Sequence, residues 1–240
     1  MSDSEFTVGI LAAARPRRDL LAKFGSYAGM FRTLLSEPKL DSKPLKYRTF
    51  NVFDDEIPEY SAQCDGYVTT GSQASVLDDL PWIRRMEELV VELHEQRRKM
   101  VGICFGHQMI AQALDGRTER CDRGWGVGVH EYRITHRHPF MVPGSVRLRM
   151  LCSHQDQVTR VPSGARVFAT SEFCPTAGMT LGEHFLSIQG HPEFTADYAL
   201  ELMHIRGESL GAAYQHGMET VHDPTDSKLF AHWMVRFLLD

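Results

Sequence analysis

The stretch KMVGICFGHQMIAQAL, residues 99–114, decides the fold because it joins two different hydrophobic patterns at a cysteine. Its first half is the continuous apolar run of a buried strand, and its second half places apolar residues at helical spacing. Gly102 and Gly106 stand where the chain must turn sharply between the two elements. A side chain at such a corner points away from the fold. Cys104 is therefore a candidate nucleophile.

The composition of the chain limits the class of protein to which it can belong. The chain has 240 residues, of which 42% are hydrophobic and 24% charged, so it can bury a substantial core. A net charge of -5 argues against a general nucleic-acid binder, and we expect no membrane span because no apolar run is long enough. The five cysteines lack paired short spacing, which favours a reducing compartment, and we therefore expect a cytoplasmic protein.

The order of predicted elements indicates an α/β fold. Strands alternate with helices through the first half of the chain, which predicts a mostly parallel central sheet with helices on both faces. After Gly116 short strand-like segments predict antiparallel additions. The predicted strands are 7–14, 46–52, 66–71, 100–105, 124–135, 145–152, 165–171 and 184–190, and the predicted helices are 18–37, 81–98, 106–114, 195–216 and 226–239. We interpret residues 1–240 as a single domain.

A cysteine nucleophile needs a negative charge on sulfur and a nearby base. The N-terminus of the helix that begins near Gly106 favours the thiolate of Cys104. A second stretch, FLSIQGHPEF at 185–194, ends a predicted strand and presents His191 and Glu193. Residues two apart in an extended segment project to the same side. The sequence thus predicts that His191 faces Cys104 while Glu193 fixes its tautomer.

These segments resemble the class I, or triad, glutamine amidotransferases. The family's cysteine elbow G-x-C-x-G-x-Q matches GICFGHQ at 102–108, and its base segment matches HPE at 191–193. TTGS at 69–72 and CSHQDQV at 152–158 match the oxyanion loop and a substrate-adjacent segment, in the family's order. The resemblance implies a flavodoxin-like sheet and a glutaminase reaction. Cys104 would attack the γ-carbonyl, forming a γ-glutamyl thioester that water hydrolyses.

The resemblance also assigns roles around the triad. The backbone N–H of Phe105 and that of Ser72 or Gly71 would form the oxyanion hole. Gln108, Ser153 and His154 match segments that contact the substrate. Many family members carry Gly-Gly-Pro at the oxyanion loop, whereas this chain has Gly71-Ser72-Gln73, so the backbone N–H is kept but the turn has less conformational freedom.

A second level of resemblance concerns the early segment FGSYAGMFRTLL at 24–35. It is similar to stand-alone GMP-synthase-like amidotransferases, which include the plant γ-glutamyl peptidases. This likeness implies that Tyr27 shapes the pocket beyond the γ-glutamyl group. The expected substrate is a small molecule, glutamine or a γ-glutamyl compound, and neither a metal nor an organic cofactor is predicted.

Three functions remain open from the sequence. The first is a hydrolase of γ-glutamyl amide bonds that acts alone. The second is a glutaminase subunit that supplies ammonia to a separate synthetase partner. The third is a non-catalytic binding or redox-sensing protein that uses Cys104. The apolar stripe of the final predicted helix, 226–239, either closes the chain's own core or docks a partner or a second copy in a homodimer.

Overall fold

One nine-stranded sheet organises the chain in the computed structural model, which describes residues 5–38 and 44–240. The strand order is β2-β1-β3-β4-β11-β10-β9-β6-β7. The first five of these strands in space run parallel: β2 (Leu45–Asn51), β1 (Phe6–Ala12), β3 (Gly66–Thr69), β4 (Lys99–Ile103) and β11 (Phe185–Ile188). This half confirms the predicted parallel sheet, with a doubly wound order whose ligand sites lie at the carboxyl ends of the strands.

The other half of the sheet is an antiparallel extension. It contains β10 (Gly178–Leu181), β9 (Ala165–Thr170), β6 (Gly126–Ile134) and β7 (Arg147–His154). A separate two-stranded sheet pairs β5 (Arg117–Arg120) with β8 (Asp156–Arg160). The predicted antiparallel additions are confirmed, whereas β5, β8 and β10 were not predicted. Each of these three has five residues or fewer, too short for a clear period of two.

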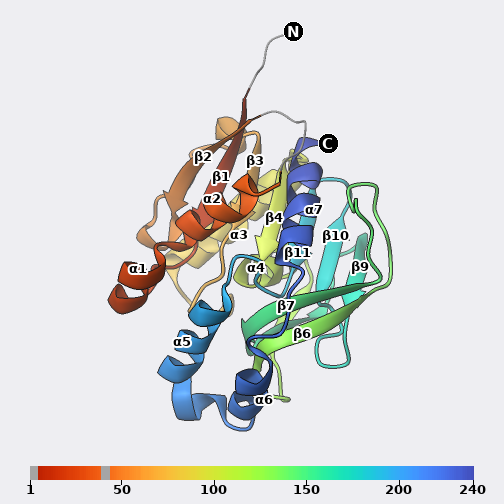
Figure 1. The fold of residues 1–240 in the computed structure, drawn as a ribbon. Helices are drawn as coiled ribbons and strands as arrows, with labels where there is room; N and C mark the ends of the chain where they lie inside the picture. Colours follow the sequence, from red (N-terminus) through yellow and green to blue (C-terminus); the bar gives the residue numbers. More distant parts are fainter. Residues whose placement is uncertain (1–4, 39–43) are drawn as a thin grey trace.

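Helices cover both faces of the parallel half. Helices α2 (Tyr27–Ser36) and α7 (Ser227–Leu239) pack on one face, and α3 (Pro81–Glu95) and α4 (Phe105–Ala113) pack on the other (Figure 1). The final helix buries its aromatic stripe, because Phe230, Trp233 and Phe237 are each at most 2% exposed. Its apolar face therefore closes the chain's own core rather than offering a docking surface.

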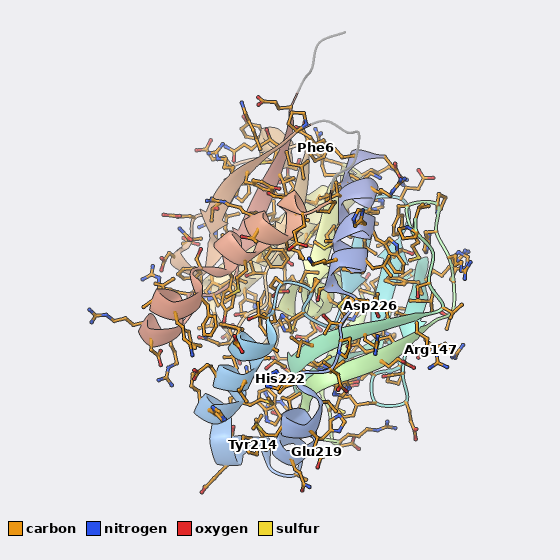
Figure 2. All side chains as sticks on the ribbon, viewed as in Figure 1. Phe6, Arg147, Tyr214, Glu219, His222 and Asp226 are labelled. Carbon is orange, nitrogen blue, oxygen red and sulfur yellow. The ribbon has the colours of Figure 1, made fainter. Side chains whose placement is uncertain are left out.

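A third hydrophobic cluster lies under the antiparallel extension. Helices α5 (Ala196–Arg206) and α6 (Ala213–Thr220) pack against β6 and β7 there. Figure 2 places α6, marked by Tyr214 and Glu219, at the end of the molecule opposite Phe6. In the described ranges, no helix has the length and apolar character needed to cross a membrane.

Two predicted helices are broken by glycines. The helix expected over 18–37 divides into α1 (Arg18–Phe24) and α2, because Gly25 takes φ 80° and Ser26 caps α2 by accepting a hydrogen bond from the Gly29 N–H. The helix expected over 195–216 ends at Arg206. Gly207 and Gly211 both have positive φ, 49° and 54°, and a short 3₁₀ turn stands between α5 and α6.

Candidate active site

Cys104 occupies the turn between β4 and α4 in a strained conformation. Its φ and ψ are 49° and −95°, a region that a residue with a side chain occupies at a cost of about 1–3 kcal/mol. The flanking glycines make the turn sterically feasible. A Cβ on Gly106 would lie 1.5 Å from Thr69 Oγ1, and one on Gly102 would lie 2.7 Å from the Gly106 carbonyl. This corner confirms the turn that the elbow sequence predicts.

His191 is held next to this corner by its backbone, by one face of its ring and by the Cε1 edge of the ring. Its N–H donates to the Leu151 carbonyl of β7 at 2.8 Å. Phe194 stacks on the imidazole with ring centroids 3.9 Å apart and planes 6° from parallel. Gly71 lies against the imidazole as well, since a Cβ there would be 2.7 Å from His191 Cε1. The ring is therefore fixed in one orientation.

Glu193 decides the charge of this histidine. The Nδ1–H of His191 donates to Glu193 Oε1 at 2.8 Å, and both side chains are almost fully buried. Burial by itself lowers the pKa of His191, but the charges of Glu193 and Cys104 outweigh it and raise the pKa to about 10. At neutral pH the imidazole is thus protonated, with a proton available for a leaving amine.

A cavity of about 220 Å³ opens in front of Cys104. Phe105 and Ser72, from which the sequence predicts oxyanion donors, both line it together with Cys104. The Ser72 hydroxyl donates to the Ala13 carbonyl at 2.9 Å and accepts from the Ala74 N–H at 3.1 Å, so this loop is anchored at the position where the family motif differs. Gly71 is not part of the lining and packs on His191 instead.

Gln108, Ser153 and His154 also line the cavity, as the sequence predicts. His154 presents its neutral form, because its Nδ1–H donates to the Asp156 carbonyl at 3.2 Å and burial lowers its pKa to about 3. The Asp156 carboxylate accepts from Arg120 Nε at 2.8 Å and from the Ser75 hydroxyl at 2.6 Å. His154 Nδ1 and the Asp156 carboxylate in this part of the lining are therefore hydrogen-bonded to other groups of the protein.

Tyr27 lies behind the cavity and not in it. It is 5% exposed and does not belong to the cavity lining, which corrects the expectation that it reaches the substrate. Its hydroxyl accepts a hydrogen bond from the Tyr198 hydroxyl at 2.7 Å and contacts Gln73, which does line the cavity. The break at Gly25 shifts α2 so that Tyr27 becomes its first, buried residue.

Sequence reasoning missed two residues of this site. Arg206, the last residue of α5, lines the cavity, lies over the Trp125 ring at 4.4 Å and donates to the Ser153 hydroxyl. Gln189 directs its amide at Cys104 Sγ, with Nε2 and sulfur 3.4 Å apart. Gln189 directly follows β11 and stands two residues before His191, so the extended-chain spacing that placed His191 near Cys104 could also have placed Gln189 there. Nothing local in the sequence indicates that Arg206 turns toward the cavity.

Comparison with known proteins identifies the class. The family model of class-I glutamine amidotransferases matches residues 45–205, which is well over half of the chain. The chain belongs to this family and is a hydrolase of the glutamine amidotransferase type.

Individual relatives agree with this assignment. Gamma-glutamyl peptidase 3 of Arabidopsis thaliana is 30% identical over 188 residues, covering 74% of each chain. The GMP synthase [glutamine-hydrolyzing] of Aromatoleum aromaticum is 31% identical over 176 residues, which is 70% of this chain but 31% of that enzyme. A glutamine amidotransferase structure from Methylobacillus flagellatus superimposes with a TM-score of 0.74, at 20% identity, over 98% of this chain and 93% of that one, and shows the shared fold.

Proposed function

We propose that the chain hydrolyses γ-glutamyl amide bonds through a thioester on Cys104, acting on γ-glutamyl peptides as well as glutamine. The observation that carries this proposal is the union of a strained, cavity-facing cysteine with a buried, protonated His191–Glu193 pair. A structural cysteine needs neither the strained turn nor the histidine. A nucleophile needs both.

The reaction follows from these groups. The Cys104 thiolate adds to the γ-carbonyl carbon, and the backbone N–H groups of Phe105 and Ser72 stabilise the resulting oxyanion. His191 gives its proton to the departing amine as the C–N bond breaks, leaving a γ-glutamyl thioester. The neutral imidazole then removes a proton from water, hydroxide adds to the thioester carbonyl, and the C–S bond breaks to release glutamate.

The position of Arg206 favours substrates that carry a carboxylate in the leaving group. Its contacts in the described chain are the Ser153 hydroxyl and the Trp125 ring, and neither is an anion. The other arginine in the cavity, Arg120, is already paired with Asp156. Burial lowers the pKa of Arg206 more than the charge of Cys104 and the nearby Tyr27 and Tyr198 raise it, and within the described chain no carboxylate is its ion-pair partner. A substrate carboxylate would supply that partner. The similarity to a γ-glutamyl peptidase favours a peptide that ends in one.

A second candidate is a glutaminase that passes ammonia to a synthetase. The likeness to the glutamine-hydrolysing part of a GMP synthase favours it. The two candidates differ in what the purified chain does alone. A stand-alone hydrolase turns over substrate unaided, whereas a glutaminase subunit stays slow until its partner assembles the site.

The deciding experiment measures turnover of γ-glutamylglycine, γ-glutamylmethylamide and glutamine by the purified chain, with Cys104→Ser as the blank. We expect Cys104-dependent release that is fastest from γ-glutamylglycine. Slow turnover of all three substrates, together with a thiol that a glutamine-like electrophile still labels, would favour the glutaminase subunit. A Cys104 that this electrophile does not label would leave a non-catalytic binding protein, whereas a labelled Cys104 that turns over no substrate with any partner would leave a redox sensor.

The same substrates test Arg206. Replacing Arg206 by Met keeps the stem over Trp125 but removes the charge. We expect kcat/KM for γ-glutamylglycine to fall about tenfold to hundredfold, mainly through KM, since a hydrogen-bonded charge pair is lost. γ-Glutamylmethylamide lacks the carboxylate in its leaving group. If kcat/KM falls equally for both substrates in Arg206→Met, Arg206 binds the glutamyl carboxylate and not the leaving group.

A further inference from the structure

Two buried amide side chains form a continuous row between the cavity wall and the nucleophile. Gln108 Nε2 lies 2.7 Å from the Asp156 carbonyl oxygen and 3.1 Å from Gln189 Oε1. Gln189 Nε2 lies 3.4 Å from Cys104 Sγ. Gln108 is 4% exposed and Gln189 is fully buried. We call this row, from the Asp156 carbonyl through Gln108 and Gln189 to Cys104, the amide relay.

The chemistry of the first acceptor fixes the direction of the whole amide relay. A backbone carbonyl only accepts hydrogen bonds, so Gln108 must turn its NH₂ group toward Asp156. The same NH₂ group then faces Gln189, which must present its oxygen there. With its oxygen used, Gln189 directs N–H at the Cys104 sulfur. Neither amide can flip without placing two like groups against each other in a buried site.

We propose that Gln189 is a catalytic hydrogen-bond donor to the Cys104 thiolate, held in its donating orientation by Gln108. The inference rests on the proposed function of Cys104 as the nucleophile. A thiol sulfur accepts hydrogen bonds weakly, whereas a thiolate accepts them well, so a donor fixed in place favours the charged form. The amide relay thus acts on the state of the sulfur that attacks the substrate.

Gln189 complements His191 because the two groups supply different things. The imidazolium supplies charge and a proton, and it loses that proton to the leaving amine. An amide N–H cannot be given up at any ordinary pH, so Gln189 donates to sulfur throughout the reaction. It therefore stabilises the thiolate again when the thioester breaks, at which point His191 has regained its proton from water.

The amide relay also ties the nucleophile to the substrate-facing loop. The Asp156 carboxylate is clamped by Arg120 and Ser75, so its backbone carbonyl is held in place for Gln108. Gln108 has both its N–H groups committed within the protein. Its part in the amide relay is consequently that of a positioning residue, whatever its remaining oxygen contacts in the substrate.

The test is the pH dependence of Cys104 alkylation by iodoacetamide in the full chain, with Cys104→Ser as the background. Gln189→Met keeps the volume of the side chain but removes the donor. We expect its rate profile to move to higher pH by about one unit or more, the size of a lost hydrogen bond to a charged group. Gln108→Met, which frees Gln189 to rotate, should give a smaller shift in the same direction.

Gln157→Met is the matched control, because Gln157 is also buried and its Nε2 has no hydrogen-bond partner among the described residues. Its profile should coincide with that of the wild type. If Gln189→Met fails to fold, Gln189→Leu takes its place, since it is also neutral and places no donor on sulfur. An unshifted profile in a folded Gln189 variant overturns the inference.

Alkylation needs no γ-glutamyl substrate, so this outcome is separate from the turnover experiment. If the alkylation profile of the Gln189 variant shifts but the wild type turns over no substrate, the proposed function is rejected and the amide relay is kept. If the wild type turns over substrate but the profile does not shift, the amide relay is rejected and the proposed function is kept.

Discussion

His191 and His154 are two histidines of equal burial, of which the first is positively charged at neutral pH and the second is neutral. Each is 3% exposed, and each is attached to β7: His154 is its last residue, and His191 bonds to its Leu151 carbonyl. His191 donates its Nδ1–H to a carboxylate, and its pKa rises to about 10. His154 donates its Nδ1–H to a backbone carbonyl, and burial lowers its pKa to about 3.

The difference teaches that the partner of a buried histidine, and not its burial, decides its chemistry. His191 can move protons because Glu193 makes the charged ring stable. His154 stays neutral across the physiological range and serves as a fixed polar group in the cavity lining.

The largest effect is expected from Glu193→Gln, which gives His191 a neutral partner like that of His154. The amide still accepts a hydrogen bond, but burial is no longer opposed by a carboxylate, so the pKa of His191 falls. We expect kcat to fall by about 10²–10⁴-fold. Steady-state kinetics measure the fall, and the imidazole NMR signal follows the protonation. A variant with unchanged kcat would show that the charge of Cys104 alone keeps His191 protonated.

A smaller loss is expected from Gly71→Ala, which moves the imidazole without changing its partner. The new Cβ would meet His191 Cε1 at 2.7 Å, so the ring must shift against the Phe194 stack. We expect kcat to drop by about tenfold to hundredfold, with the unfolding temperature nearly unchanged. Gly144→Ala is the control, since its nearest neighbour is 3.6 Å away. Equal activities of the two variants would refute the steric argument.

The smallest effect concerns stability as a function of pH. The pKa of His191 is raised from about 6.5 to about 10, so its stabilisation is complete below about pH 6.5 and is lost as the pH rises toward 10. The pKa of His154 is lowered from about 6.5 to about 3, so its contribution is present above about pH 6.5 and is lost as the pH falls toward 3.

Unfolding temperatures across this range should therefore decline on both sides of neutrality. His191→Asn should flatten the alkaline side and His154→Asn part of the acid side, where the lowered pKa of His107, about 4, also acts. Identical profiles for the two variants would mean that the histidines do not differ in charge in the folded chain.

The sequence predicted the parts of the site that depend on local geometry. The two elbow glycines, the position of Cys104 and the spacing of His191 and Glu193 each stand in a short continuous stretch of sequence. The alternation of strands and helices likewise predicted the parallel half of the sheet and its covering helices.

Features that depend on packing at a distance were not predictable. Gly25 and Gly207 look like tolerated glycines inside helical patterns, and only the fold decides that both break the helix. The entry of Arg206 into the cavity depends on the packing of α5 against β7, which are distant in sequence. Tyr27 was placed in the pocket because its segment resembles one near the site, but its hydroxyl is taken by Tyr198.

The strained corner at Cys104 has a consequence for the order of events during synthesis. Its conformation is held from both sides, by Thr69 of β3 against Gly106 and by the bond from the Cys104 N–H to the Ile188 carbonyl of β11 at 2.9 Å. Cys104 leaves the ribosome well before Ile188, Gln189, His191 and Glu193 do. A nascent chain thus carries Cys104 in an ordinary, unstrained conformation, and the strained one is imposed only when the sheet is complete.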